Sequence, residues 1–454
     1  MKKVLLVSLI VMAAVLAKTQ SFDVDTISMT GNIDDRINIV FLSDGYQEEE
    51  LDKFIEDVHW MEDALLGKSP YKEYRSYFNS FAIKVPSAVS GAANDPDSLI
   101  DNYFGSTFNT AGIWRLVTAR RSSRIQSVLR DNFPQYDQVV LIVNDSRYGG
   151  SGGWAATSTT NQAGPEICIH EIGHSFAGLS DEYWAGPQYA RENINMTQEA
   201  DREKVKWKNW LDYRGTGIYS HSESPSWKRP HQNCEMRFLN RQFCPVCQEA
   251  ITDRILDMTT PIISYYPAED NFTHDEPEIE FSVNLLAPTP NTLNIRWTLN
   301  TDSIASNTDT VKFSSSRLIP GENKVVAFIL DTTKYIRSSS HSRIHRHKII
   351  WDFNSGTSGI HLNNIKRERL DLDIFPNPAA DFVRLRWQLE AAAEIGISLV
   401  ANDGKEIWSK KQEKYPEGEF TSEVDINSLR LPAGLYHFIF SIDGYKQDFP
   451  LIVK

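Results

Sequence analysis

Residues 170–183 read HEIGHSFAGLSDEY, and this stretch does most to decide the fold. In an α-helix, residues four apart lie on one face, so His170 and His174 can present two imidazoles to the same metal ion. Glu171 would project beside them, within reach of an attacking water molecule. Gly178 is a typical helix terminator, and the chain that returns after it can supply a third ligand. The stretch therefore predicts a helix that ends near residue 178 and a zinc site of the hydrolase type.

The third ligand is expected from the carboxylates that follow this helix. Counting three residues from the terminating glycine selects Asp181, and the adjacent Glu182 offers the same chemistry. Asp181 is our choice, and Glu182 stays as the alternative. His221 and His231 are further alternatives, as a ligand or for oxyanion stabilisation, although a surface position is the simpler expectation for each. One catalytic Zn²⁺ is expected, with Glu171 as the general base.

The residues on the N-terminal side of the motif predict an α/β domain. Apolar runs typical of strands buried on both faces alternate with helical patterns. The runs are Ile37–Ser43, Ser80–Val85 and Gln138–Asn144, and the helical patterns cover Glu48–Leu66 and Ile113–Arg130. Alternation of this kind favours a three-layer α/β core. The glycine-rich residues 149–157 are expected to form an edge strand along the cleft, where an extended peptide can pair.

After about residue 261 the pattern changes to short β-type runs separated by turn residues. These runs are Glu278–Leu285, Thr292–Thr298, Thr310–Phe313 and Lys324–Leu330. Their spacing predicts an immunoglobulin-like β-sandwich over 261–353. Residues 354–369 are first rich in Gly, Ser and Asn and then basic, which predicts a linker. A second β-sandwich is expected over 370–454.

Length, charge and the first residues bound the class of protein. The chain has 454 residues, enough for roughly two to four domains. Its formal net charge of −13 has the wrong sign for holding a nucleic-acid backbone, so no nucleic-acid partner is expected. Residues 1–17 combine Lys2 and Lys3 with the apolar run Val4–Leu16 and the small residue Ala17, which predicts a cleaved signal peptide. The mature chain is expected to be secreted and monomeric.

Export would place the four cysteines in a compartment where disulfides persist. Cys244 and Cys247 have the spacing of a redox pair or of half a zinc site, but no second such pair exists. A structural disulfide is therefore expected between Cys234 and either Cys244 or Cys247. Cys168 is either the remaining partner or a buried thiol. His341, His345 and His347 lie in a polar stretch that is expected to be solvated, and a second metal site is the alternative for them.

The long string at 170–183, with CEMR at 234–237 and FCPVC at 243–247, resembles the M64 metallopeptidase family, often called IgA peptidase M64. The resemblance covers about residues 35–258. It implies a zinc endopeptidase with a metzincin-like core, in which Met236 forms a hydrophobic floor beneath the metal. The chain departs from the metzincin pattern HExxHxxGxxH, because its glycine comes one residue later and Asp181 takes the place of the third histidine. The family name does not establish immunoglobulin A as the substrate.

The last unit resembles the type A C-terminal sorting domain of the type IX secretion system. The residues that carry this resemblance are DIFPNPA at 373–379, DGK at 403–405 and LPAGLY at 431–436. The resemblance implies passage across a bacterial outer membrane, with the secretion machinery as a partner, and then release or attachment at the cell surface.

These observations predict an α/β metzincin-like zinc peptidase domain at 24–258, followed by two all-β domains. The expected function is that of a secreted zinc-dependent metalloendopeptidase, which hydrolyses peptide bonds of protein substrates through a zinc-activated water. The alternative is a surface adhesin or binding protein with a catalytically inactive peptidase-like domain. A zinc amidase that acts on peptidoglycan peptides is a second alternative.

Overall fold

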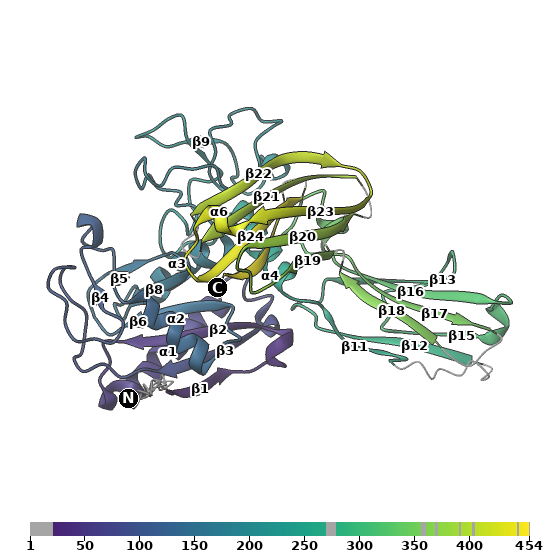
Figure 1. Ribbon diagram of the computed structural model, residues 1–454, viewed down its shortest axis with the longest axis horizontal. Coiled ribbons are helices and arrows are strands. Elements are labelled where there is room, and N and C mark those ends of the chain that lie inside the picture. Colours follow the sequence, from purple (N-terminus) through teal and green to yellow (C-terminus); the bar gives the residue numbers. More distant parts are fainter. Residues whose placement is uncertain are drawn as a thin grey trace, which may run out of the picture.

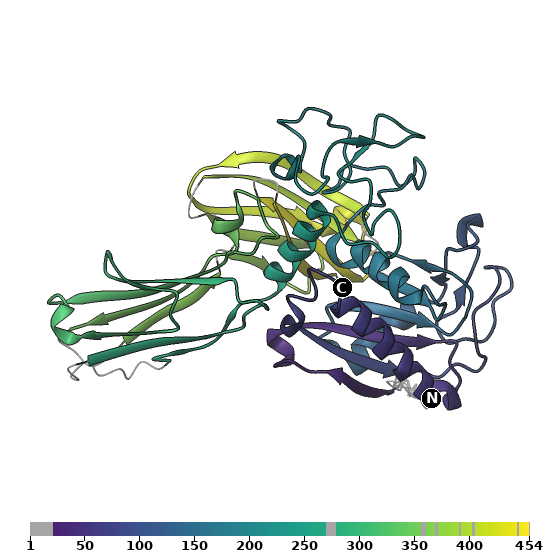
Figure 2. The ribbon, with the colours of Figure 1, turned by 180° about the vertical axis from the view of Figure 1, so that it is seen from behind.

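The computed structural model describes residues 21–268, 278–355, 360–367, 371–389, 392–401, 405–442 and 445–453. The predicted signal peptide at 1–17 and residues 403–404 of the predicted sorting domain lie outside this part of the chain. Among the helices of the described residues, none has the length and apolar character that a membrane span requires. Figures 1 and 2 show an α/β unit at the N-terminal end, a β-rich unit that extends to one side, and a second β-rich unit at the C-terminal end.

A six-stranded sheet forms the centre of the α/β unit, with the strand order β1-β3-β2-β6-β8-β7. Its strands are β1 (Asp23–Ser28), β2 (Ile37–Asp44), β3 (Phe78–Lys84), β6 (Gln138–Val143), β7 (Gly150–Ser151) and β8 (Ala155–Thr159). The four central strands are parallel, whereas β1 and β7 are antiparallel edge strands. The three predicted apolar runs form β2, β3 and β6. The edge strand predicted over 149–157 is confirmed only in part, because Gly150–Ser151 form the edge strand β7 whereas residues 155–157 belong to the inner strand β8.

Two separate cores lie on the two faces of this sheet, which explains why β2 and β6 carry long apolar runs. In β2, Ile39 and Phe41 face one core, and Val40 and Leu42 face the other. Helices α1, α3 and α4 cover the first core, and α2 covers the second. The helices are α1 (Leu51–Leu66), α2 (Ser122–Asn132), α3 (Gly164–Ala177) and α4 (Pro245–Met258). The predicted three-layer arrangement is confirmed.

The helix predicted over Ile113–Arg130 is wrong in its first half, because α2 covers only the second half. Upstream of α2, β5 (Thr118–Ala119) pairs with β4 (Ser106–Thr107). The N–H of the buried Val117 donates to the carbonyl oxygen of Gly150 at 3.2 Å. Pairing with other strands thus takes the backbone groups that a longer helix would have used.

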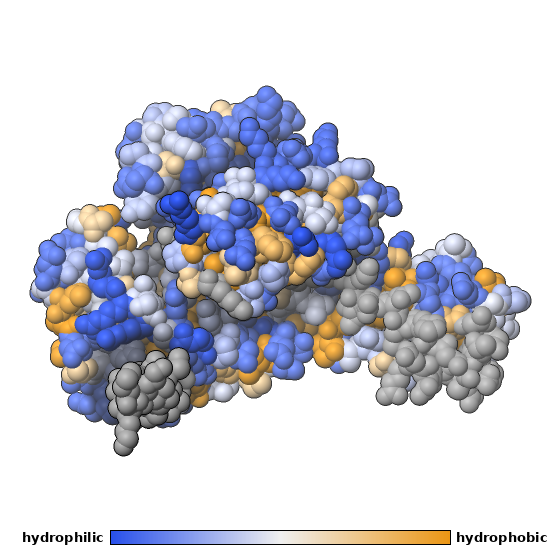
Figure 3. Space-filling model, in the orientation of Figure 1, coloured by the Kyte–Doolittle hydropathy of each residue, from blue (hydrophilic) through white to orange (hydrophobic). Residues whose placement is uncertain are grey.

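Between α3 and α4 the chain is mostly irregular and includes the short pair β9 (Tyr219–Ser220) and β10 (Lys228–Arg229). Short 3₁₀ turns complete the α/β unit. They are Ile33–Asp35, Glu48–Glu50, Arg75–Tyr77, Thr110–Gly112 and Lys208–Trp210. The region around β9 stands out from the α/β unit in both ribbon views, and Figure 3 shows a mostly hydrophilic surface over it.

The middle β-rich unit has two sheets that share one core. Their strand orders are β11-β12-β15 and β14-β13-β16-β17-β18. The elements are β11 (Ile262–Tyr266), β12 (Glu278–Leu285), β13 (Leu293–Leu299), β14 (Asp302–Ser306), β15 (Thr310–Ser314), a 3₁₀ turn (Ser315–Arg317), β16 (Glu322–Asp331), α5 (His341–Ile344), β17 (His347–Asn354) and β18 (Ile360–Arg367). Trp297 of one strand stacks on Trp351 of another, with ring centroids 5.7 Å apart at the centre of this core.

The linker predicted at 354–369 is wrong in its central part, because β18 occupies Ile360–Arg367 and pairs with β17. β18 is the edge strand of its sheet. An edge strand needs few apolar residues, so its polar composition did not distinguish it from a linker.

The C-terminal β-rich unit also has two sheets around one core, ordered β19-β20-β23 and β22-β21-β24-β25. The elements are β19 (Asp371–Phe375), β20 (Phe382–Leu389), β21 (Ala393–Ala401), β22 (Glu406–Tyr415), β23 (Gly418–Asp425), α6 (Ile426–Leu429), β24 (Gly434–Ile442) and β25 (Tyr445–Val453). In β20, alternate residues are buried, and Trp387 packs against Phe440 of the opposite sheet.

Direct hydrogen bonds join the middle unit to the α/β unit. The hydroxyl of Tyr77 donates to the carbonyl oxygen of Leu286 at 2.7 Å, and the hydroxyl of Tyr74 donates to the carboxylate of Asp331 at 2.6 Å. Both tyrosines are buried. The expectation of a solvated stretch at 341–347 is wrong, because this stretch packs into the same junction and its last two histidines are each only 2% exposed.

Candidate active site

The motif at 170–183 begins on α3, which follows the buried strand β8. Gly178 ends α3 with φ of 63°, a left-handed conformation that glycine adopts without strain. Its N–H donates to the carbonyl oxygen of His174 at 3.0 Å. The predicted end of the helix is confirmed. The rings of His170 and His174 lie on one face of α3, with centroids 4.9 Å apart.

The turn after α3 brings Asp181 back to both imidazoles. Its Oδ1 lies 3.0 Å from Nε2 of His170 and 3.3 Å from Nε2 of His174. These three side chains form a group whose donor atoms all lie within 4.8 Å of one another. Two ligands of a tetrahedral zinc ion with bonds of about 2.0 Å would lie about 3.3 Å apart, which matches this spacing.

Backbone carbonyl groups fix the orientation of both rings. Nδ1 of His170 lies 3.0 Å from the carbonyl oxygen of Glu235, and Nδ1 of His174 lies 2.7 Å from that of Leu179. A carbonyl oxygen only accepts hydrogen bonds, so each Nδ1 carries the proton. A neutral imidazole then has only a lone pair at Nε2, and both lone pairs face an oxygen of Asp181. Either a cation or an additional proton on each ring is needed to make this arrangement attractive.

The charges at this site raise the pKa of His170 and lower that of Asp181. Burial opposes a charged ring at His170, but the hydrogen bond to Asp181 and the charge of Glu171 outweigh burial and raise the pKa of His170 to about 9. Burial would raise the pKa of Asp181, but hydrogen bonds from the two imidazoles hold it well below its usual range. Protons and a metal cation would therefore compete for the same two nitrogens.

Glu171 lies next to this group, with its Oε2 4.0 Å from Nε2 of His174 and only 14% of its side chain exposed. Burial raises the pKa of Glu171, whereas the charges of the two histidines lower it. The backbone that follows β7 covers this carboxylate closely. A Cβ on Gly152 would lie 3.0 Å from Oε2 of Glu171 and 2.7 Å from Cβ of His174. Only glycine lets the edge strand pass so near to the site.

Met236 is fully buried and packs against the middle of α3. A Cβ on Gly173 would lie only 2.6 Å from Sδ of Met236, so the sulfur occupies the space that a side chain would need. The carbonyl oxygen of Met236 accepts from the N–H of Glu182 at 2.7 Å. Met236 thus supports both the helix and the turn that carries Asp181.

Two residues near the site were not anticipated from the sequence. The ring of Tyr183 stacks on that of His170 at 6.3 Å, and the guanidinium of Arg115 lies 5.8 Å from the centroid of the Tyr183 ring. Side-chain hydrogen bonding to Tyr183 raises the pKa of Arg115, so this cation stays charged. Arg115 is distant from the motif in sequence and lies where a helix was expected, so no local pattern pointed to it.

A cavity of about 150 Å³ lies directly beside the group of His170, His174 and Asp181. His174 and Asp181 line one side, and the loop that follows α3 supplies Gln188, Tyr189 and Arg191 on the other. The cavity is large enough for one amino-acid side chain, and its lining is of mixed polarity. Its contact with two of the three candidate ligands makes it a candidate binding pocket.

The alternative ligands do not join the group. The carboxylate of Glu182 points away from the histidines and accepts hydrogen bonds from the thiols of Cys247 and Cys244 at 3.2 and 3.5 Å. His221 is 1% exposed and packs against Trp184, so its expected surface position is wrong. His231 bonds the carbonyl oxygen of Arg214.

All four cysteines of the chain are free, so the expected disulfide is absent. Sγ of Cys234 lies 3.7 Å from Sγ of Cys247. Cys168 is a buried thiol on α3, which was one of its two expected states.

Comparisons with known protein families give matches in the N-terminal and the C-terminal parts of the chain. Residues 26–216 match the family described as IgA Peptidase M64. This part of the chain is similar to the M64 peptidases. This match includes the whole motif at 170–183 but ends before Cys234 and α4, whereas the resemblance in the sequence was expected to reach about residue 258. M64 peptidases are metallopeptidases, and the three-residue group is suited to hold their metal.

Residues 373–454 match the secretion system C-terminal sorting domain. The expected secretion is confirmed: the chain is exported through the type IX system to the cell surface or the extracellular space. A search of curated proteins finds no match.

Several solved structures show distant likeness. They include dimeric latent PorU from Porphyromonas gingivalis (13% identity, TM-score 0.18), which covers 52% of this chain, while the match spans only 23% of PorU. OgpA from Akkermansia muciniphila has 11% identity and a TM-score of 0.23, with 73% of this chain and 95% of OgpA covered. The FN1–FN3 domains of chicken CNTN1 have 9% identity and a TM-score of 0.14, with 52% and 73% covered. These likenesses are too weak to bear on function.

Proposed function

We propose that the chain is a secreted zinc-dependent metalloendopeptidase. His170, His174 and Asp181 hold one catalytic zinc ion, and Glu171 is the general base. Protein or peptide chains are the substrates, and the mature enzyme acts as a monomer. The α/β unit is a metzincin-like catalytic domain, and the middle unit is an immunoglobulin-like module.

The observation that carries this proposal is the direction of the two imidazoles. Each Nδ1–H donates a hydrogen bond to a backbone carbonyl oxygen, at 3.0 Å for His170 and 2.7 Å for His174. The lone pairs at Nε2 of the two rings therefore converge on Asp181. Two neutral nitrogens and one carboxylate are a typical catalytic zinc set, with the fourth position free for water or substrate. Carbonyl acceptors behind ligating histidines are the usual outer partners of such sites.

A zinc ion bound here would polarise the scissile carbonyl group and make an attacking water acidic near neutral pH. Glu171 has the position and the raised pKa to take the proton from that water and pass it to the leaving amine. The Arg115–Tyr183 pair is suited to stabilise negative charge that develops on the carbonyl oxygen. The adjacent cavity takes one side chain of the substrate.

Glu171→Gln tests this proposal, because the amide keeps the shape of the side chain and cannot accept the proton. Metal content should equal that of the wild type, and cleavage of casein or a fluorogenic peptide should fall by about 10²- to 10⁴-fold. Glu203→Gln, on the exposed loop after α3, is the matched control and should cleave normally. Metal binding without any cleavage by the wild type would favour a binding protein with an inactive peptidase-like domain. Cleavage of cell-wall peptides alone would favour an amidase.

A further inference from the structure

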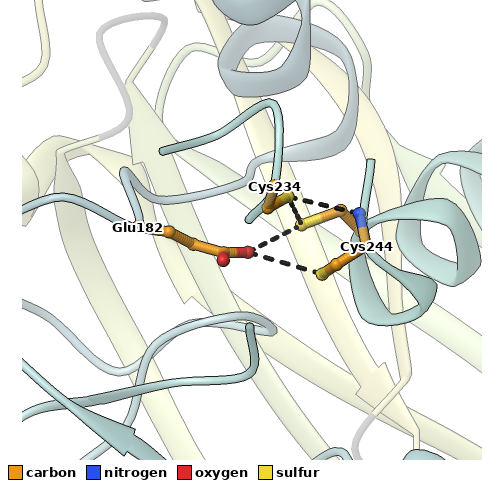
Figure 4. Close-up of side chains that lie close together, drawn as sticks. Glu182, Cys234 and Cys244 are labelled. Carbon is orange, nitrogen blue, oxygen red and sulfur yellow. Dashed lines mark hydrogen bonds between the residues drawn. The ribbon is translucent and has the colours of Figure 1, made fainter. Parts of the chain in front are cut away.

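A second cluster of metal-ligating side chains lies just behind the candidate active site. Glu182, Cys234, Cys244 and Cys247 form a group whose donor atoms all lie within 4.8 Å of one another, and all four residues are buried. Figure 4 shows the carboxylate of Glu182 pointing toward the sulfurs of Cys234 and Cys244, which come from separate segments of the chain. The mechanism described above uses none of these side chains.

The spacing of the cluster fits a tetrahedral zinc ion and does not fit a disulfide. With Zn–S bonds of about 2.3 Å and a Zn–O bond of about 2.0 Å, two sulfur ligands lie about 3.8 Å apart, and a sulfur and an oxygen about 3.5 Å apart. The sulfurs of Cys234 and Cys247 are 3.7 Å apart. Oε1 of Glu182 is 3.5 Å from Sγ of Cys244 and 3.2 Å from Sγ of Cys247. A disulfide would hold two sulfurs at about 2.0 Å.

The surroundings of Glu182 give independent evidence that a cation binds to the cluster. It is 0% exposed, and its Oε2 has no hydrogen-bond partner within the part of the chain that the structure describes. Buried carboxylates are usually paired or bound to a metal, because an isolated one is costly. Within the described residues, the hydrogen bonds to the Glu182 carboxylate come from the thiols of Cys244 and Cys247, which are weak donors. A cation bonded to the sulfurs and to this carboxylate would satisfy all four side chains together.

Donor groups around the cluster are placed to stabilise thiolates. The N–H of Cys244 donates to Sγ of Cys234 at 3.2 Å, and the amide of Asn195 donates to Sγ of Cys247 at 3.7 Å. Cys244 is also the N-cap residue of α4, whose dipole favours negative charge at that end. The buried guanidinium of Arg229 interacts with the charge of Glu182. These contacts offset the negative charge of three thiolates and one carboxylate.

We infer that Cys234, Cys244, Cys247 and Glu182 bind a second, structural zinc ion. All four positions are filled by protein, as in structural zinc sites, so no place is left for a substrate. The ion would join the turn after α3 to the segment before α4. Glu182 follows the candidate ligand Asp181, and Cys234 precedes Glu235, whose carbonyl oxygen orients His170. The structural ion would therefore hold the catalytic ligands in place without taking part in the reaction.

Metal content and cobalt spectroscopy of the full-length chain test this inference. The wild type should hold two zinc ions per chain, and cobalt substitution should give the thiolate-to-cobalt charge-transfer absorption that sites of nitrogen and oxygen ligands lack. His170→Ala with His174→Ala should leave one ion and keep the absorption. Cys244→Ser with Cys247→Ser should abolish the absorption. Cys168→Ser, which removes a buried thiol outside the cluster, is the matched control and should keep both ions.

The number of reactive thiols per chain, counted in denaturant with a chelator, distinguishes a zinc site from a disulfide and needs no variant. A structural zinc site requires four reactive thiols per chain, whereas a disulfide within the cluster leaves two and overturns the inference. One zinc ion per chain, no charge-transfer absorption and normal peptide cleavage would overturn the second site alone. Two zinc ions with the thiolate signature but no cleavage would support the structural site and contradict the proposed catalytic function.

Discussion

Gly173→Ala tests how tightly Met236 supports the candidate active site. The new Cβ would lie 2.6 Å from Sδ and 3.3 Å from Cε of Met236, so one side must move by about 1 Å to reach an ordinary contact. Overpacking of this kind lowers the free energy of unfolding by about 1–3 kcal/mol. The higher helix propensity of alanine offsets about 1 kcal/mol of that loss. A shift of about 1 Å in the histidines should lower peptide cleavage by about 10²-fold.

A double-mutant cycle isolates this contact. Met236→Ala alone should destabilise the catalytic domain by about 2–5 kcal/mol, because it leaves a cavity beneath α3. Within the Met236→Ala background, Gly173→Ala no longer meets the sulfur and should be neutral or slightly stabilising. The coupling free energy, measured from urea unfolding of the four proteins, should be about 1–3 kcal/mol. Additive effects, within about 0.5 kcal/mol, would refute the role given to Met236.

Three further substitutions probe the site and its surroundings. Gly152→Ala should reduce cleavage by about 10²-fold with little change in metal content, because the new Cβ would crowd His174 and Glu171 where the edge strand passes; unchanged kinetics would contradict that close approach. Asp181→Asn should weaken zinc binding at the catalytic site by at least about 10²-fold in competition with a chelator, since it removes the anionic ligand. Burial and the nearby charge of Arg229 lower the pKa of His221 to about 4, so the folded chain binds fewer protons there than the unfolded chain, whose histidine titrates near its ordinary pKa. Its contribution to the free energy of unfolding should be complete above about pH 6.5 and decline toward pH 4, and His221→Gln should remove that part of the pH dependence in thermal unfolding; an identical pH profile for both proteins would exclude it.

The parts of the site that follow from local geometry could be predicted from the sequence. The pairing of His170 with His174 depends only on the helical repeat, and Gly178 ends the helix because it adopts a left-handed conformation. The apolar runs of β2, β3 and β6 identified the central sheet for a similar reason, since strands buried on both faces are rich in apolar residues.

Other features depend on contacts between distant segments, which the sequence pattern does not encode. Asp181 and Glu182 are adjacent and chemically alike, yet one side chain faces the histidines and the other faces three cysteines, because the turn after α3 is irregular. The spacing of Cys234, Cys244 and Cys247 fits a disulfide and a metal site equally well. This segment has three cysteines, so a single disulfide would leave one thiol unpaired. That odd number was a signal in favour of the metal site.

A crystal structure of the zinc-loaded chain with anomalous diffraction data at the zinc edge tests the central claim most directly. An anomalous peak is expected about 2.0–2.1 Å from Nε2 of His170, Nε2 of His174 and a carboxylate oxygen of Asp181. The claim would be contradicted if Glu182 or His221 took the place of Asp181. It would equally fail if no peak lay between the two imidazoles.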